Sequence, residues 1–281
     1  MATLVEISRE LKQEPLVFAV PLNEKLPWFI VTDTPAEYIA DKHADRNPRN
    51  RYYVISFEDW RTTQRRPHCK VTRSIGEAGN LRAESMRILI ENDICTEKYE
   101  NDKEEITSNV HECLKPFSRN INQSTNEWEI PAAESAQRLD LRQKRIFTID
   151  PVTARDLDDA LSIEKISDKI YEIGVHIADV SYFVSQGSSL DKEALKRSTS
   201  TYFVHEVYPM LPRLLCEQLC SLNPNVDRLT YSIFYRMDLN GDIDKTFKPV
   251  VKRSVIRSCA KWTYELAQDI IDGKIETQEQ L

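Results

Sequence analysis

The sequence is poor in glycine, with 6 residues among 281, and it has no long apolar run. No segment approaches the roughly 20 consecutive apolar residues that a membrane-spanning helix requires. Residues 1–6 also lack the basic, apolar and small-residue zones of a signal peptide. These absences predict a protein with no membrane association and a cytoplasmic location.

Cysteine pairs and an excess of positive charge are also missing. The six cysteines are scattered and make no CxxC framework, which favours free thiols over disulfides or a zinc site. The net charge of -7 at pH 7 provides no general attraction to nucleic acid. This balance argues against a simple basic RNA-binding module, so a nucleic-acid function would depend on local features and a metal ion.

The N-terminal region has an all-β pattern. Short apolar runs alternate with turn-rich breaks over residues 16–71, which predicts a small barrel of the OB or cold-shock kind. A basic stretch beside Trp60 suits either contact with a nucleic-acid backbone or a solvated turn and edge strand. Its residues are Arg61, Arg65, Arg66, His68 and Lys70.

A polar, acidic connector separates this region from the rest. Residues 96–126 have only modest helical periodicity, as expected of a surface connector. Before them, Asn80 can cap a helix that begins at Leu81. We therefore predict a barrel in residues 1–75, a linker helix and connector in residues 76–130, and a second domain in residues 131–281 that opens with a helix at residues 132–139.

Four aspartates crowd into ten residues directly after the strand-like run 146–149. Asp150, Asp156, Asp158 and Asp159 would repel one another, by roughly 4 kcal/mol for a pair 4 Å apart at an effective dielectric near 20. A hard divalent cation such as Mg²⁺ or Mn²⁺ would compensate this charge. The alternative is an acidic, solvated turn. An EF-hand does not fit, because the loop lacks its glycine and its final glutamate.

The segments after the aspartates predict a sheet. Residues 160–164 and 170–180 resemble a hairpin, and the alternation in the second strand predicts burial of the face carrying Tyr171 and Ile177. His176 falls on the other face, where a structural role is favoured over a catalytic one. Asn240 and Gly241 predict a hairpin with a partner strand at residues 245–251, and a helix is expected around residues 264–271.

Residues 197–203 combine a cation, hydroxyls and aromatic rings. Arg197 and Tyr202 would suit gripping a phosphate and stacking a base, and a half-buried strand with a core tyrosine explains the same pattern.

Three motifs in order carry a family resemblance. The segments IFTIDPVTARDLDDALS, GVHIADVSYFV and MLPRLLCEQLCSLNP resemble the RNase II / RNB family of exoribonucleases. The sequences of these motifs are most similar to those of the eukaryotic branch called Dis-three-like exonuclease two. The resemblance implies a mainly β plus α chain, with an OB/cold-shock-like barrel, the second of the family's pair and possibly incomplete, followed by the N-terminal part of an α+β RNB catalytic domain.

The resemblance also implies an activity. The expected reaction is Mg²⁺-dependent, 3′-to-5′ hydrolysis of single-stranded RNA with 3′ uridine tails to nucleoside 5′-monophosphates, by a monomer acting independently of the exosome. Asp150, Asp156 and Asp159 match the family's metal-binding positions, and Asp158 matches the aspartate most needed for the chemical step. Tyr202 matches an aromatic that stacks near the RNA 3′ end.

The chain departs from the family pattern by omission. It shows no first cold-shock domain, no S1 domain and no arginine-rich later half of the catalytic domain, so the resemblance implies a chain truncated at both ends. The competing expectation is a catalytically inactive RNA-binding regulator with an RNB fold. A plain structural protein with an acidic loop would require the three ordered motifs to be coincidental.

Overall fold

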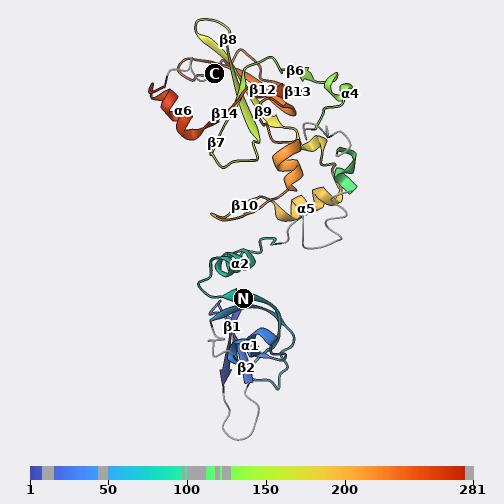
Figure 1. The fold of residues 1–281 in the computed structure, drawn as a ribbon, viewed down its shortest axis with the longest axis vertical. Helices are drawn as coiled ribbons and strands as arrows, with labels where there is room; N and C mark the ends of the chain where they lie inside the picture. Colours follow the sequence, from blue (N-terminus) through green and yellow to red (C-terminus); the bar gives the residue numbers. More distant parts are fainter. Residues whose placement is uncertain are drawn as a thin grey trace. The chain divides into compact units, whose positions relative to one another are not determined.

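The protein divides into two compact units. The structure is a computed structural model that describes residues 1–7, 16–43, 50–96, 99, 112–117, 121 and 128–275. One unit comprises Met1–Glu97 with Tyr202–Tyr208, and the other comprises Lys98–Thr201 with Pro209–Leu281 (Figure 1). Each unit contains a hydrophobic cluster of its own.

The first unit is built on a closed barrel in the strand order β1-β2-β3-β5-β4. Its strands are β1 (Ala2–Ile7), β2 (Leu16–Pro21), β3 (Phe29–Val31), β4 (Arg51–Phe57) and β5 (His68–Glu77). Alternate residues of β2 are buried, as in a strand with one face toward a core. The predicted OB-like barrel is confirmed.

The barrel contains a strand that the apolar runs do not predict. β1 precedes residue 16, and it closes the barrel by pairing with β2 along its length and with Tyr53 of β4 through Ala2. Helix α1 (Ala36–His43) adds Tyr38 to the core. After β5, Asn80 caps α2 (Leu81–Glu91) as predicted, because its side chain accepts hydrogen bonds from two backbone N–H groups of the first turn.

The second unit is built around a sheet in the order β14-β7-β8-β9-β12-β13-β6. Antiparallel pairing joins the central strands β7 (Ile146–Asp150), β8 (Asp159–Lys165), β9 (Ile170–Ala178), β12 (Asp227–Asp238) and β13 (Val250–Arg257). The short strands β14 (Ala260–Thr263) and β6 (Leu139–Asp140) extend the two edges in parallel.

The remaining elements are short. Those in the described parts of the chain include helices α4 (Ala132–Ser135), α5 (Ser189–Arg197) and α6 (Tyr264–Ile271), the 3₁₀ turn η1 (Val180–Tyr182), the π-helical turn η2 (Leu214–Leu219), and the paired strands β10 (Thr201–Tyr202) and β11 (Val207–Tyr208).

Two expected elements differ in the structure. The helix expected over residues 132–139 ends at Ser135, because Leu139 pairs with Ser254 of β13 and becomes part of β6. Gly241 does form a turn, with a φ of 87°, but the partner strand β13 begins at Val250 rather than near residue 245. The predicted β8–β9 hairpin and the helix α6 are confirmed.

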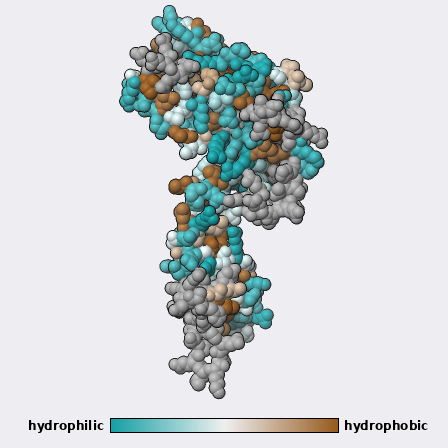
Figure 2. All heavy atoms as spheres, in the orientation of Figure 1, coloured by the Kyte–Doolittle hydropathy of each residue, from teal (hydrophilic) through white to brown (hydrophobic). Residues whose placement is uncertain are grey.

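The distribution of hydrophobic residues on the surface and the state of the cysteines are those expected from the composition. On the face drawn in Figure 2, hydrophobic residues are dispersed among hydrophilic ones in both units. All six cysteines are free thiols, as predicted. Within the described parts of the chain, no helix has the length and apolar character needed to cross a membrane.

Candidate active site

The sheet brings the two ends of the acidic loop together, because the loop connects two neighbouring strands. Asp150 ends β7 and Asp159 begins β8, and residues 151–158 connect these two neighbouring strands. A turn starts the loop, with the backbone N–H of Ala154 donating to the carbonyl of Pro151 over 3.0 Å. Two aspartates are therefore fixed by strand geometry, while Asp156 and Asp158 depend on the loop.

Two side chains from distant segments hold the middle of the loop. Lys261 Nζ donates to the carbonyl oxygen of Ala154 over 2.6 Å. Ser221 Oγ donates to the carbonyl of Arg155 over 2.9 Å and accepts from the backbone N–H of Leu157 over 3.1 Å. Backbone groups that would otherwise lack partners are thereby satisfied.

Backbone groups and a buried side chain complete the attachment. The carbonyl of Leu157 accepts from the N–H of Leu222, and the carbonyl of Asp158 accepts from the N–H of Ala178, both over 2.9 Å. The Leu157 side chain is fully buried in the core of the unit. The loop is consequently an ordered part of the core edge, which argues against a freely solvated turn.

Burial and nearby negative charge raise the pKa of two of the four aspartates, Asp150 and Asp158. Burial raises the pKa of Asp158, and the neighbouring charge of Asp156 raises it further. Burial likewise raises the pKa of Asp150, where Asp159 adds to the effect and Lys261 opposes it. Because burial and neighbouring carboxylates penalise the ionised form, a cation placed among these aspartates would be bound favourably.

The donor chemistry fits a hard divalent ion. Asp150 Oδ2 is buried and lacks a hydrogen-bond partner among the residues that the structure describes. The available donors are carboxylate oxygens, which Mg²⁺ and Mn²⁺ prefer. Within the same described residues, no three His, Cys, Asp or Glu side chains are already assembled around one point. The residues match the ion in donor type and charge, but their carboxylates do not yet surround a single point as the ligands of a bound ion would.

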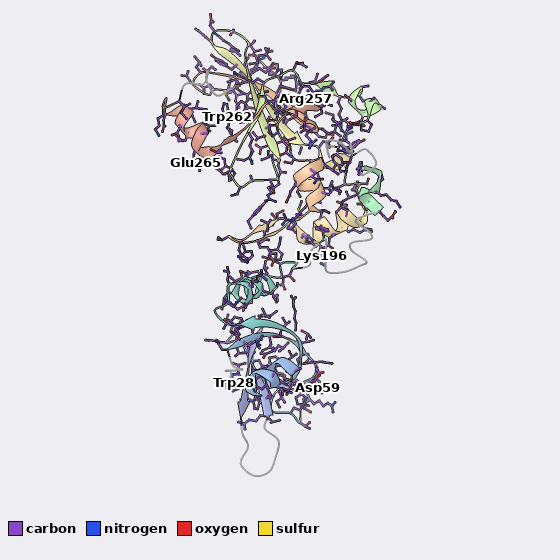
Figure 3. The ribbon with its side chains drawn as sticks, viewed as in Figure 1. Trp28, Asp59, Lys196, Arg257, Trp262 and Glu265 are labelled. Carbon is purple, nitrogen blue, oxygen red and sulfur yellow. The ribbon has the colours of Figure 1, made fainter. Side chains whose placement is uncertain are left out.

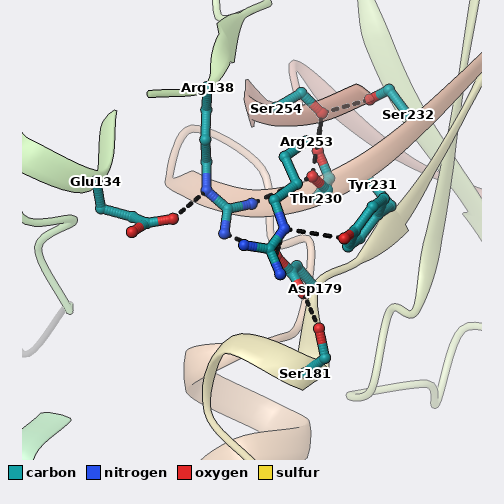
Figure 4. A network of polar contacts seen from close by, with 9 residues as sticks. All are labelled: Glu134, Arg138, Asp179, Ser181, Thr230, Tyr231, Ser232, Arg253 and Ser254. Atoms are coloured by element: carbon teal, nitrogen blue, oxygen red, sulfur yellow. Dashed lines mark hydrogen bonds and ion pairs between the residues drawn. The ribbon is translucent and has the colours of Figure 1, made fainter. Parts of the chain in front are cut away.

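A buried ion pair fixes the end of β9 beside the loop. Asp179 follows Ala178, and its Oδ2 lies 2.7 Å from Arg138 Nη2, with both side chains at most 1% exposed. Glu134 lies 2.6 Å from Arg138 Nε, and Ser181 donates to Asp179 Oδ1 over 2.6 Å (Figure 4). Since breaking such a pair leaves an unpaired buried charge, this strand end is held firmly.

His176 lies inside the sheet, and the buried face of β9 is the opposite of the predicted one. Ile177 is 41% exposed, whereas His176 is fully buried. Its Nε2 lies 2.9 Å from Ser162 Oγ and its Nδ1 lies 2.6 Å from Ser232 Oγ. The face prediction was wrong because hydroxyls on neighbouring strands satisfy the imidazole. The contacts agree with a structural role for His176.

Tyr202 and Arg197, the two residues expected to contact RNA, differ in solvent exposure. Tyr202 is 62% exposed, so it is no core tyrosine. Arg197 is almost fully buried: its Nε lies 2.9 Å from Glu193, its Nη1 donates to the carbonyl of Pro209, and its guanidinium lies 4.0 Å from the ring centroid of Tyr99. These contacts occupy Arg197 within the fold, and its role toward RNA stays a prediction.

The basic stretch of the barrel is partly engaged with its own neighbours. Arg61 and His68 both pair with Asp59, and the Arg66 guanidinium lies 5.5 Å from the ring centroid of Trp28. Trp60 is 56% exposed and available for contact.

Sequence reasoning missed Ser221 and Lys261. Ser221 lies in the third quoted motif, where nothing distinguishes it from its neighbours. Lys261 lies in β14, which pairs with β7. Trp262, the next residue of β14 (labelled in Figure 3), stacks on Phe147 of β7 with ring centroids 4.4 Å apart. Nothing in this four-residue strand signals that its lysine reaches the loop.

Comparison with known proteins decides the family. A family profile described as the RNB domain matches residues 138–281, and one described as the Dis3-like cold-shock domain 2 matches residues 16–93. The chain belongs to the RNB family. The RNB match includes all four aspartates of the loop, and the family prediction is confirmed.

Relatives and a solved structure agree with this assignment. DIS3-like exonuclease 2 of Xenopus tropicalis is 41% identical, over 98% of this chain and 31% of its own length. The Arabidopsis thaliana protein named "Inactive exonuclease DIS3L2" is 36% identical, over 85% of this chain and 21% of its own length. This chain thus spans less than a third of either curated relative.

The fold is shared with a bacterial enzyme. Mycoplasma genitalium RNase R, solved in complex with ribose-methylated single-stranded RNA, superposes with a TM-score of 0.75 at 23% identity. The similarity covers 99% of this chain and 39% of the RNase R chain. The predicted order of barrel and RNB sheet is therefore confirmed.

Proposed function

We propose that the protein acts as a 3′-to-5′ exoribonuclease that degrades single-stranded, 3′-uridylated RNA to nucleoside 5′-monophosphates with Mg²⁺, for which Mn²⁺ substitutes. The observation that carries the proposal is the complete aspartate loop inside the matched RNB region, ordered by contacts from distant segments. The single-stranded RNA bound by RNase R supports the substrate class.

The proposed roles are those that the family resemblance implies for the four aspartates. Asp150 and Asp159 at the strand ends, with Asp156 between them, would hold the metal ion, and Asp158 would serve the chemical step. A bound ion would polarise the scissile phosphate, lower the pKa of an attacking water and stabilise the leaving oxygen. The exposed ring of Tyr202 is suited to stacking on a base, and Arg197 is proposed to support RNA binding.

An RNA-shortening assay tests the proposal. The protein is mixed with Mg²⁺ and 5′-labelled single-stranded RNA ending in uridines, and stepwise shortening with release of mononucleotides is expected. Asp158→Asn should slow the reaction by roughly 100-fold or more. Shortening that is unaffected by Asp158→Asn would contradict the assigned role.

A catalytically inactive RNA-binding regulator is the second candidate. The relative named an inactive exonuclease, at 36% identity, favours it, whereas the intact set of four aspartates favours the nuclease. Titration of Mn²⁺ against the wild type and Asp150→Asn separates the two. Equal, negligible metal binding together with RNA binding would support the inactive regulator.

Cellular context completes the proposal. We propose action in the cytoplasm as a monomer, without the exosome, and a domain division near residues 75 and 130. Light scattering of the purified protein, cell fractionation and limited proteolysis would test these points. A stable dimer, a nuclear location, co-purification with the exosome or cleavage elsewhere would contradict the corresponding statement.

A further inference from the structure

One serine hydroxyl contacts both peptide groups that flank Asp156. Ser221 Oγ donates to the carbonyl of Arg155, which precedes the Asp156 Cα, and accepts from the N–H of Leu157, which follows it. A residue has only two soft backbone dihedrals, and they set the relative orientation of these two planar peptide groups. A hydroxyl bound to both therefore restricts the direction in which the Asp156 side chain leaves the backbone.

Ser221 is itself held in place. Its side chain is fully buried, and its own carbonyl accepts a hydrogen bond from Nε of the buried Arg228 over 2.8 Å. The next residue, Leu222, donates its backbone N–H to the carbonyl of Leu157. Residues 221 and 222 thus make three hydrogen bonds to residues 155–157, which gives the hydroxyl a fixed position from which to orient the loop.

The element before Ser221 also lies close to the aspartates. η2 is a π-helical turn, a rare geometry that often occurs at functional sites. Its Glu217 carboxylate lies 4.0 Å from Nη1 of Arg155, the residue that precedes Asp156. The turn therefore lies beside the acidic loop.

We propose that Ser221 is a positioning residue that orients Asp156 for the divalent ion. The inference rests on the proposed function, because it assigns Ser221 to the same metal site. Residues that orient metal ligands without touching the metal typically change its affinity by about 10- to 100-fold when they are substituted. Ser221 meets this description through the Asp156 backbone.

The test compares Ser221→Ala with Ser254→Ala. Ser254 is an equally buried serine of the same unit, and the hydrogen bonds of its hydroxyl to described residues go to Thr230 and Ser232 rather than to the loop. We expect Ser221→Ala to raise the Mn²⁺ dissociation constant about tenfold, while Ser254→Ala stays near the wild type. The Leu157 amide should also exchange with solvent faster in Ser221→Ala alone. Ser221→Cys, which fills the same space with a weaker hydrogen-bonding group, carries the test if the alanine variant does not fold.

Mn²⁺ affinity and amide exchange together distinguish a failure of the positioning role of Ser221 from a failure of the proposed metal site. Wild-type Mn²⁺ affinity in Ser221→Ala or Ser221→Cys, with the Leu157 amide still protected, would overturn the positioning role. If wild type and Asp150→Asn bind Mn²⁺ equally poorly, the metal function itself fails. In that case faster exchange confined to residues 154–158 would still support Ser221 as the residue that orders the loop, and unchanged exchange would overturn it.

Discussion

His176 is held neutral inside the sheet between Ser162 and Ser232. Burial lowers the pKa of its imidazole to about 4, from an ordinary value near 6.5. The two hydroxyls exchange hydrogen bonds with the neutral ring, so the residue supports packing without carrying charge. Its influence on stability should therefore depend on pH.

Acidification should destabilise the second unit through this residue. Between pH 6.5 and about 4 the unfolded chain binds a proton at His176 and the folded protein does not, so the free energy of unfolding falls as the pH falls. The full effect of such a shift is about 3 kcal/mol. Urea unfolding measured from pH 4 to 7.5 should show a shallower pH dependence for His176→Gln than for wild type. Identical slopes would contradict the prediction.

At the scale of the element, β9 shows where sequence patterns succeed and fail. The hairpin with β8 follows from alternation and a polar turn, which are local properties. The buried face does not, because His176 is satisfied by Ser162 and Ser232 from neighbouring strands. Such pairing appears only once the strands lie side by side. The helix α6 was expected around residues 264–271 and lies there, because helix signals are local.

Gly174 gives β9 the room that this polar pairing needs. A Cβ added at Gly174 would overlap Ser162 Oγ and lie 2.8 Å from His176 Nε2. Gly174→Ala should therefore lower the free energy of unfolding by about 1–3 kcal/mol, as overpacking of a core does. Thermal unfolding of Gly174→Ala, with and without Ser162→Ala, measures the effect. The second substitution should recover part of the loss, and additive losses would show that the overlap is not the cause.

At the scale of the whole molecule, the position of the candidate site in the sequence was more predictable than the contacts that hold its loop in place. The acidic loop and its place after β7 follow from residues 146–159 alone. The groups that hold the loop belong to Ala178, Ser221 and Lys261, which lie far from it along the sequence. Long-range contacts of this kind depend on topology, which no local pattern contains.

The two separate cores predict a localised response to metal. Because the proposed site lies wholly in the second unit, Mn²⁺ at 100 times its dissociation constant should stabilise that unit by about 2.7 kcal/mol and leave the barrel unchanged. Amide exchange in β7–β9, compared with β4 and β5, measures this difference. Asp150→Asn should abolish the change. Equal protection of both units would place the ion elsewhere.

The contact between Lys261 and Ala154 also has a consequence for protein synthesis. The two residues are 107 positions apart, so a growing chain exposes all four aspartates long before it contains the lysine that holds their loop. Contacts that close such long segments form late and slowly in folding. The acidic loop should therefore gain its last supporting contact only after translation has passed β14, so an incomplete chain on the ribosome would present a less firmly held metal site.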